Sequence, residues 1–547
     1  MSPHMLRGLM QDDYPLTLQQ VLDRVRGRYA DSEVVTMRDG EKKRASYGEV
    51  AQRVDRLSRA LESLGVEPGD RVATFAWNSQ EHLEVYLAAP CMGAVLHTLN
   101  IRLFEDQVTY VVNHAKDKVI LVDASLVPLL EKVAPSFENP PAYVVIGDGD
   151  MGALPGALRY EELLAEQDEG FDYPKLDERM AAGLCYTSGT TGNPKGVLYS
   201  HRSNMLHAMG QCMADSMGLS SDDRNLPIVP MFHANAWGIP YGSCLSGADL
   251  IMPGPQLEAE PLTKLIEDEK VTFAAAVPTI WMDMLRHADE HGADLSSLRL
   301  VVCGGSAVPL TLMQEFEERH DVRIIQAWGM TETSPLGSVA RPPADASEEE
   351  HWDVRNTAGR ISPMVDARIV SDEGEELPWD GEATGELQVR GPWVAADYYE
   401  DPAGPEKFDG EWLRTGDIAA IDAQGFIRIS DRTKDVIKSG GEWISSVELE
   451  GEIMAHSSVL EAAVIAKPDE RWGERPLACI VIEEGAELTM DGLREHLEPR
   501  VAKWWLPDEV VVVKEVPKTS VGKFDKKVLR QRLEDGELQS EALAEAG

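Results

Sequence analysis

Residues 186–196 read YTSGTTGNPKG, a stretch in which hydroxyl side chains and glycines surround one lysine, Lys195. The segment just before it, 182–185, is small and apolar, which predicts a loop that leaves the end of a buried strand. Backbone N–H groups of a glycine-rich loop can approach phosphate oxygens closely, and serine and threonine hydroxyls add further donors. The stretch is not a Walker A loop, because Lys195 stands between Pro194 and Gly196. We expect a nucleotide held in another way; a flexible linker is the alternative interpretation.

A second candidate for chemistry lies near the carboxyl end, within residues 514–532. Seven basic residues stand there against two acidic ones, Glu515 and Asp525: Lys514, Lys518, Lys523, Lys526, Lys527, Arg530 and Arg532. A charge run usually forms a solvated face, but in a chain of formal net charge −42 it is also a place to look for an anionic ligand. Lys523 follows Gly522 in the stretch KTSVGKF, which predicts that this lysine stands at a loop tip.

The composition predicts a cytoplasmic protein of several globular units. At 547 residues, of which 43% are hydrophobic, the chain is long enough for roughly three or four units of about 150 residues. A net charge of −42 disfavours nucleic acid and anionic membranes as partners, because both would repel the chain. The N-terminus lacks the apolar core of a signal peptide and no segment reaches 18 apolar residues, so we expect no integral membrane segment. The cysteines are scattered, as expected of reduced core thiols: Cys91, Cys185, Cys212, Cys244, Cys303 and Cys479.

Alternating helical and strand patterns predict the elements that carry these segments. Apolar residues at helical spacing occur at 18–25 and at 50–64, where Gly65 is placed to end the helix. The short apolar runs that follow lie at 71–77, 118–123, 143–147, 271–278, 298–307 and 322–329. This alternation predicts βα units around mostly parallel sheets. The last three runs end in glycine or small residues, which is where open α/β sheets place their ligands.

The carboxyl-terminal part has a different pattern. Short alternating strands follow Gly385, and a compact tail with two β-rich runs, 461–466 and 477–483, follows Asp431. The stretch 431–443 has a charged start and a glycine pair, which predicts a linker or hinge. We therefore expect a large α/β part followed by a smaller unit.

Five further motifs accompany the stretch 186–196. They are GGSA at 304–307, QAWGMTET at 326–333, RTGD at 414–417, SDRTKDVIKSGGEW at 430–443 and PKTSVGKFDKK at 517–527. In this order the set resembles the AMP-forming adenylating superfamily of acyl-CoA synthetases, adenylation domains of peptide synthetases and luciferases, over nearly the whole chain. The fatty acyl-CoA synthetase branch is the most similar, on the forms IKSGGEWISSVELE at 437–450, AKWWLPD at 502–508 and PMFHANAW at 230–237.

The resemblance implies a fold, a domain arrangement and an activity. The fold is α/β, with a large N-terminal domain of α/β sheets plus a small β-barrel-like subdomain at 1–430, a hinge at 431–437, and a small mobile α+β domain at 438–547. The activity is that of an ATP-dependent acid–CoA ligase, which adenylates a carboxylic acid with release of pyrophosphate and then transfers the acyl group to CoA with release of AMP. Mg²⁺ is the implied cofactor, ATP and CoA are co-substrates, and homodimers are common in this branch.

We expect the acid to be a medium- or long-chain fatty acid. The same chemistry on a short or functionalised acid, such as methylmercaptopropionate, is the alternative, because one methylene changes binding by only about 1 kcal/mol. A non-catalytic nucleotide-binding regulator would have lost Lys523, Glu332 or Asp417, and all three are present. No sequence feature supports luciferase-like oxidation, whereas loading of a separate carrier protein stays open.

The resemblance also implies the residues of a nucleotide site. The residues that would cradle the β- and γ-phosphates are Thr187, Ser188, Gly189, Thr190, Thr191, Gly192 and Lys195. Glu332 and Thr187 would hold Mg²⁺, which prefers oxygen ligands, and Thr331 would reach the α-phosphate. The adenine slot would comprise Gly305, Gln326, Ala327, Trp328 and Gly329. Asp417 would accept hydrogen bonds from the ribose hydroxyls, with Arg432 as a donor nearby.

The C-terminal domain would contribute to both steps. Lys523 would reach in to neutralise the reacting carboxylate and the α-phosphate, and Lys434 would be the hinge position around which this domain swings. The residues implied along the pantetheine path and near the nucleotide are Gly440, Gly441, Lys438 and Trp443.

The stretch FHANAW would serve the acid. In the fatty acyl branch the histidine, here His233, lies by the nucleotide and the carboxylate, next to Ala234. Trp237 would gate the acyl tunnel. A histidine beside Phe232 is equally well interpreted as a packed core residue, so both interpretations of His233 stand at this point.

Overall fold

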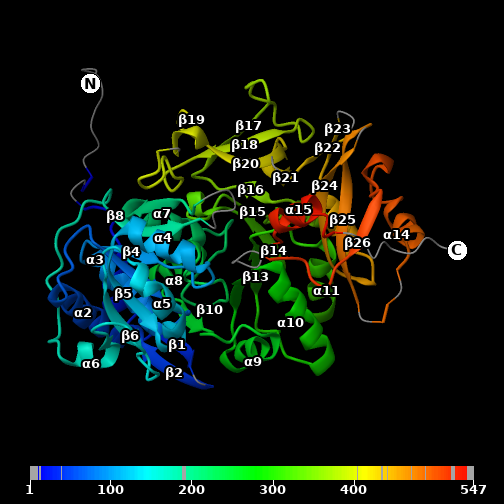
Figure 1. Ribbon diagram of the computed structural model, residues 1–547. Helices are drawn as coiled ribbons and strands as arrows, with labels where there is room; N and C mark the ends of the chain where they lie inside the picture. The colour runs from blue at the N-terminus through cyan, green and yellow to red at the C-terminus, as the bar shows by residue number, and fades with distance from the viewer. Residues whose placement is uncertain are drawn as a thin grey trace, which may run out of the picture.

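The computed structural model describes residues 10–11, 14–38, 40–187, 193–402, 404–432, 435–439, 442–469, 471–483, 485–486, 488–518 and 524–538. Within these residues the strands form three sheets, of seven, fourteen and five strands. In Figure 1 the seven-stranded sheet lies at the left, and the five-stranded sheet lies at the right. The fourteen-stranded sheet runs from β1 and β2 at the lower left through the middle to β17 at the top.

The seven-stranded sheet carries the glycine-rich stretch. Its strand order is β7 (Leu158–Arg159), β6 (Ala142–Ile146), β5 (Asp117–Asp123), β3 (Arg71–Phe75), β4 (Val95–Thr98), β8 (Ala181–Tyr186) and β9 (Gly196–Ser200). Neighbouring strands are parallel, apart from β8 and β9, which run antiparallel on either side of residues 187–195. The strands predicted at 71–77, 118–123 and 143–147 are β3, β5 and β6, with ends that differ by one or two residues.

The helices of this part follow the predicted pattern. The helix expected at 50–64 is α2 (Tyr47–Ser63), which begins at a reciprocal capping box between Ser46 and Glu49. Gly65, with a φ of +80°, ends it. The pattern at 18–25 forms α1 (Gln19–Asp23), which continues as a π-helical turn, η1 (Arg24–Arg28). The other helices are α3 (Gln80–Cys91), α4 (Glu105–Ala115), α5 (Val127–Val133), α6 (Tyr160–Ala165) and α7 (His201–Cys212).

The fourteen-stranded sheet has a parallel and an antiparallel half. The parallel half runs β14 (Ile324–Trp328), β13 (Leu300–Gly304), β12 (Phe273–Ala276), β10 (Arg224–Pro227), β11 (Asp249–Met252) and β1 (Glu33–Arg38), with β2 (Glu41–Ser46) antiparallel at the edge. The antiparallel half continues from β14 through β15 (Ser338–Val339), β16 (Gly359–Ile361), β21 (Phe426–Arg432), β20 (Trp412–Ile421), β18 (Gly385–Arg390) and β17 (Asp366–Val370), with β19 (Phe408–Asp409) on β20. The β-rich part expected beyond Gly385 thus continues the large sheet.

The three late apolar runs form central strands of this sheet. The runs at 271–278, 298–307 and 322–329 are β12, β13 and β14, and every residue of β12 and β13 is buried. Strands covered on both faces read as continuous apolar segments, which is why they were predictable. The helices that accompany the sheet are α8 (Ile239–Ser246), α9 (Ala259–Glu269), α10 (Pro278–His291), α11 (Leu310–His320) and α12 (Glu348–Arg355).

The carboxyl-terminal part has its own sheet, with the order β23 (Glu442–Ile444), β22 (Ile437–Ser439), β25 (Gly473–Ile482), β24 (Val459–Asp469), and with β26 (Glu509–Val512) beside β25. Its helices are α13 (Ser446–Met454), α14 (Met490–Leu497) and α15 (Lys526–Glu534). The predicted hinge, 431–437, begins at the last two residues of β21 and ends at the first residue of β22. Among the described residues, no helix combines the length and the apolar character needed to cross a membrane.

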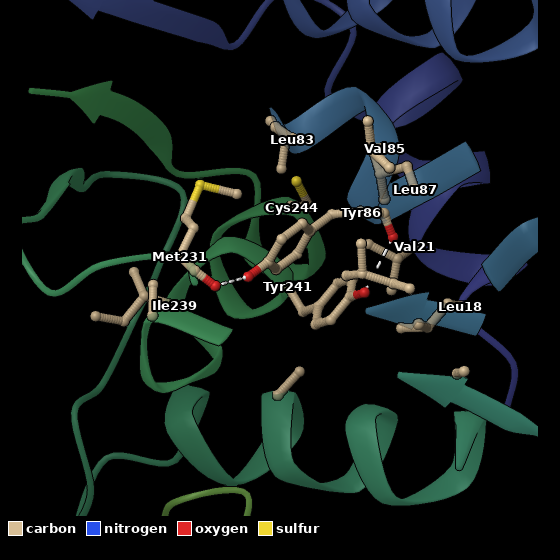
Figure 2. Packing of buried hydrophobic residues seen from close by; sticks show 14 of the residues in the cluster. Leu18, Val21, Leu83, Val85, Tyr86, Leu87, Met231, Ile239, Tyr241 and Cys244 are labelled. Carbon is tan, nitrogen blue, oxygen red and sulfur yellow. Dashed lines mark hydrogen bonds between the residues drawn. The ribbon is translucent and has the colours of Figure 1, made fainter. Parts of the chain in front are cut away.

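A buried cluster anchors the segment that leads into FHANAW. Tyr86 of α3 donates its hydroxyl proton to the carbonyl oxygen of Met231, as Figure 2 shows. Tyr241 of α8 in turn donates to the carbonyl oxygen of Tyr86 at 3.0 Å. Because all three side chains are buried, these bonds fix the backbone two residues before His233.

Candidate active site

A cavity of about 230 Å³ lies where β8, β13 and β14 end. The predicted site residues that line it are Thr187, Lys195, His233, Ala234, Trp237, Gly305, Ala327, Gly329, Thr331, Glu332 and Arg432. Residues from both large sheets therefore meet at one place, at the carboxyl ends of parallel strands, as open α/β sheets favour.

The other predicted residues that the structure describes are not on the wall of this cavity. Gln326 and Trp328 flank the lining residue Ala327 in β14, and Asp417 pairs with the lining residue Arg432. Lys438 and Trp443 belong to β22 and β23 of the five-stranded sheet. The predictions that fall outside the described residues are those for Ser188, Gly189, Thr190, Thr191, Gly192, Lys434, Gly440, Gly441 and Lys523.

Several cationic side chains gather at the cavity wall. Its described lining contains four cationic side chains, from Lys195, Lys407, Arg414 and Arg432, and one carboxylate, from Glu332. Three of these cations also pair with carboxylates outside the lining, Lys195 with Asp401, Arg414 with Glu386 and Arg432 with Asp417. Cationic side chains gathered at one cavity of an acidic chain are a place to look for an anionic ligand. Met217, Trp237, Pro335 and Leu336 form an apolar section of the same wall.

The two ends of the glycine-rich loop are joined at its base. The Thr187 N–H donates to the Lys195 carbonyl at 2.9 Å, and the Lys195 N–H donates to the Thr187 hydroxyl at 3.1 Å. The Lys195 ammonium lies 2.9 Å from an Asp401 carboxylate oxygen and 4.8 Å from the centre of the Tyr398 ring. The lysine is therefore held at the cavity wall by an acid and an aromatic ring.

Thr331 and Glu332 are buried in a short helix, η5 (Thr331–Thr333), just after β14. The Tyr199 hydroxyl donates to the Thr331 carbonyl at 2.7 Å. The Tyr398 hydroxyl donates to a Glu332 carboxylate oxygen at 2.6 Å. Burial, together with the nearby Glu332 charge, raises the pKa of Tyr398, so this phenol keeps its proton and remains a donor.

Asp417 is buried and occupied on both oxygens. One oxygen accepts the Trp328 indole N–H at 2.9 Å, and the other lies 2.6 Å from the Arg432 guanidinium. Each carboxylate oxygen accepts more than one hydrogen bond, so the carboxylate retains capacity for hydroxyl donors. Asp417, the predicted ribose acceptor, is therefore bonded both to Trp328 of the predicted adenine slot and to Arg432 of β21.

Gln326, expected in the adenine slot, uses its side chain elsewhere. Its amide oxygen accepts the Val308 N–H at 3.0 Å, and its amide nitrogen donates to the Arg355 carbonyl at 3.0 Å. Both groups thus bind backbone within the protein interior, which gives Gln326 a structural role beneath the site.

The stretch FHANAW adopts an unusual backbone. Ala234, Asn235, Ala236 and Trp237 have φ between +42° and +56°, and Gly238 continues the left-handed turn at +76°. Each non-glycine residue in this region costs of the order of 1–3 kcal/mol unless its surroundings impose it, and such strain gathers at functional sites.

Two buried side chains impose this turn. Gln211 of α7 donates to the Trp237 carbonyl at 2.6 Å, and the Asn235 amide oxygen accepts the Cys185 thiol at 3.2 Å. His233, just before the turn, is half-buried and lines the cavity, which favours the site interpretation over a packed core histidine.

Sequence reasoning missed several residues of this wall. Tyr398 and Asp401 contact the predicted lysine and glutamate, and Thr415, Arg414 and Lys407 also line or border the cavity. Tyr398 and Asp401 lie in the stretch DYYEDP, whose only local signal is an aromatic pair among acids next to a proline.

The chain matches two family models. Residues 22–399 match the AMP-binding enzyme family, and residues 448–523 match the AMP-binding enzyme C-terminal domain. A solved structure, that of the anthranilate CoA ligase AuaEII in complex with anthranoyl-AMP, is similar with a TM-score of 0.87 and 27% identity, over 96% of this chain and 99% of that one. The fold predicted from the sequence is therefore confirmed.

Curated relatives match over nearly their whole length. The medium-chain-fatty-acid–CoA ligase of Ectopseudomonas oleovorans is 44% identical, over 98% of this chain and 99% of the relative. The long-chain-fatty-acid–CoA ligase of Thermus thermophilus is 45% identical, over 95% of this chain and 96% of the relative. The 3-methylmercaptopropionyl-CoA ligase of Ruegeria lacuscaerulensis is 43% identical, over 95% of this chain and 98% of the relative. The chain therefore belongs to the AMP-binding enzyme family, as an AMP-forming acid–CoA ligase.

Proposed function

We propose that this protein is a fatty acid–CoA ligase that acts on medium- or long-chain acids. The observation that carries this proposal is the cavity wall, where four cations and Glu332 adjoin an apolar section that includes Met217, Trp237 and Leu336. Cationic side chains suit a triphosphate, and apolar side chains suit an alkyl chain. Two of the relatives named above, at 44% and 45% identity, are a medium-chain and a long-chain fatty acid–CoA ligase.

In the first step the acid carboxylate attacks the α-phosphorus of ATP, and the bond to the leaving pyrophosphate breaks. Both reactants are anions, so the site must supply positive charge where charge gathers in the transition state. Lys195 and the glycine-rich loop hold the β- and γ-phosphates, and Thr331 contacts the α-phosphate. Asp417 accepts hydrogen bonds from the ribose hydroxyl groups. Lys523 completes the site from the C-terminal domain.

Glu332 and Thr187 would hold Mg²⁺. Both supply oxygen donors and both line the cavity, while the described residues contain no cluster of three or more histidine, cysteine, aspartate or glutamate side chains. One carboxylate and one hydroxyl fit a Mg²⁺ ion that takes its other ligands from phosphates and water. When bound, Mg²⁺ neutralises the phosphate charge.

In the second step the CoA thiol attacks the acyl carbon of the adenylate, loses its proton, and AMP leaves. The C-terminal domain swings around Lys434 between the steps, which brings Gly440 and Gly441 to the pantetheine path and Lys438 and Trp443 toward the nucleotide. Trp237 gates the acid tunnel beside His233 and Ala234. A homodimer and a cytoplasmic location belong to the same proposal.

A short sulfur-containing acid is the second candidate. The 3-methylmercaptopropionyl-CoA ligase is as similar, at 43% identity, as the fatty acid ligases. The test measures pyrophosphate release over a panel of acids from 3-methylmercaptopropionate to hexadecanoate, with and without CoA, and detects AMP and thioester. We expect the highest kcat/KM for an acid of medium or long chain; a maximum at 3-methylmercaptopropionate would establish the second candidate instead. Acid-independent ATP binding with no turnover of any acid would contradict both.

A further inference from the structure

A tyrosine outside the sequence motifs contacts two of the predicted functional residues at once. Tyr398 follows β18 in a loop that packs against the cavity, and only 6% of its side chain is exposed. The face of its ring lies 4.8 Å from the Lys195 ammonium, and its hydroxyl lies 2.6 Å from a Glu332 carboxylate oxygen. Lys195 directly precedes β9, and Glu332 lies in η5 shortly after β14. These two strands belong to different sheets, so this one side chain bridges segments of both sheets at the cavity.

The loop that carries Tyr398 is itself fixed on both sides. The Tyr399 N–H donates to the Gly196 carbonyl at 2.8 Å, next to Lys195, and the Ala395 N–H donates to the Glu332 carbonyl at 2.7 Å. Asp401, in the same loop, pairs with the Lys195 ammonium at 2.9 Å. The backbone contacts therefore place the ring before any ligand arrives.

The two contacts of Tyr398 have different physical effects. The ring face attracts the Lys195 ammonium through its quadrupole and holds it at the wall. The hydroxyl donates to Glu332 and fixes the orientation of its carboxylate, and hydrogen bonds of this kind to a metal-binding carboxylate tune the affinity for the metal.

We propose that Tyr398 is a positioning residue for adenylation, which sets the phosphate-binding cation Lys195 and the metal-binding carboxylate Glu332 relative to each other. This inference rests on the proposed function, because the roles of both partners come from it. The role we assign to Tyr398 is exerted through its contacts with these two residues.

Two variants separate the two contacts. Tyr398→Phe removes the hydroxyl and keeps the ring, whereas Tyr398→Leu removes both. Tyr399→Phe is the matched control, because Tyr399 is adjacent and packs edge-on against His114 at 5.4 Å between ring centres, away from the pair. The measurement is the dissociation constant of ATP by calorimetry, in EDTA and over a series of Mg²⁺ concentrations, with circular dichroism to verify folding.

In EDTA we expect Tyr398→Phe to bind ATP like the wild type and Tyr398→Leu to bind it several-fold more weakly, because only the leucine variant lacks the ring. The Mg²⁺ concentration that gives half of the full tightening should rise about 10–100-fold in both. In turnover, KM for ATP should rise and KM for the acid should stay near the wild-type value.

A Tyr398→Phe variant with wild-type Mg²⁺ dependence would overturn the inference, and so would an equal change in Tyr399→Phe. If Tyr398→Leu fails to fold, the comparison of the two phenylalanine variants still decides. The binding arm needs only ATP and Mg²⁺, so a wild-type protein that binds Mg·ATP but activates no acid would contradict the proposed function without affecting this test.

Discussion

Asp417 and Arg432 lie opposite each other on the paired strands β20 and β21, with the guanidinium 2.6 Å from the carboxylate. The Trp328 indole donates to the second carboxylate oxygen at 2.9 Å, so the orientation of Asp417 is fixed from two sides. Arg432 is also the last residue of β21, which leads toward the C-terminal sheet. The predicted ribose acceptor is therefore held by the strand that connects the two parts of the chain.

Asp417→Asn should weaken ATP binding. The amide can accept only through its oxygen, carries no charge, and brings N–H donors next to the Arg432 and Trp328 donors. Hydrogen bonds to charged groups contribute about 1.5–3 kcal/mol, so we expect the dissociation constant of ATP to rise about 10–100-fold. The control is Asp366→Asn, which removes a surface pair with Arg390 and should change nothing. Unchanged ATP affinity in Asp417→Asn would exclude a ribose contact.

Lys523→Ala should separate the two half-reactions. Loss of one positioned charge at the reacting phosphate typically lowers the rate by about 10²–10³-fold, so pyrophosphate release with acid and ATP should fall by that factor. Thioester formation from supplied acyl-AMP and CoA should be spared, because in the proposed mechanism the C-terminal domain has carried the lysine away before this step. Lys527→Ala, in the same basic run, is the control. Equal loss of both half-reactions in Lys523→Ala would contradict the assigned role.

The parts of the site that the sequence could predict are those carried by strand ends. Thr187 directly follows β8, and Glu332 lies four positions after the last residue of β14. The carboxyl ends of parallel strands meet at one edge of a sheet. Tyr398 was not predictable in this way, because its partner Glu332 lies 66 positions away and nothing in DYYEDP has a period or a turn signal that points to it. A contact between a loop and a distant strand end is set by tertiary packing alone.

The backbone of FHANAW shows a second limit. Left-handed φ values are predicted from glycine, asparagine or aspartate, yet Ala234, Ala236 and Trp237 adopt them here. Gln211, which holds the turn, belongs to a helix more than twenty positions earlier. The element types of the fold were predictable because apolar runs and helical spacing are local; the strain of this turn is imposed by distant side chains.

Stability should fall in mild acid, because three histidines are buried without charge. Burial lowers the pKa of His82 to about 4, of His201 to about 4 and of His207 to about 3. In the unfolded chain each histidine has its usual pKa of about 6.5. Below that pH the unfolded state therefore binds more protons than the folded state, which favours unfolding. Their contribution to the free energy of unfolding is therefore complete above pH about 6.5 and is lost as pH falls toward 4 and 3.

His82→Gln isolates one of these groups. Between pH 7 and pH 4 the free energy of unfolding of the variant should fall by about 3 kcal/mol less than that of the wild type, measured by urea denaturation. The difference between the two proteins cancels the titration of the carboxylates. His291→Gln, at the exposed end of α10, is the control and should keep the wild-type pH dependence. The prediction is wrong if His82→Gln and His291→Gln lose the same free energy of unfolding between pH 7 and pH 4.

A buried ion pair should make the C-terminal part sensitive to the loss of either charged partner. The Lys526 ammonium, at the start of α15, lies 2.7 Å from Glu450 of α13, and their side chains are only 10% and 9% exposed. Lys526 also donates to the Ser446 hydroxyl at 2.6 Å, and Ser446 donates to the buried Asp431 of β21 at 2.5 Å. The network thus joins α13 and α15 of the C-terminal part to β21 of the large sheet. Lys526 stands three positions after Lys523 in the sequence.

Lys526→Met should destabilise this part by about 3–5 kcal/mol, because it leaves the Glu450 carboxylate buried without its cation. Lys518→Met is the matched control, since Lys518 pairs with Glu461 at 2.6 Å but is 41% exposed, and such pairs contribute about 0–1 kcal/mol. Chemical denaturation measures both. The double variant Lys526→Met/Glu450→Met should recover most of the loss, because neither charge then remains in the interior. If Lys526→Met costs no more than Lys518→Met, the network does not hold the C-terminal part against the large sheet.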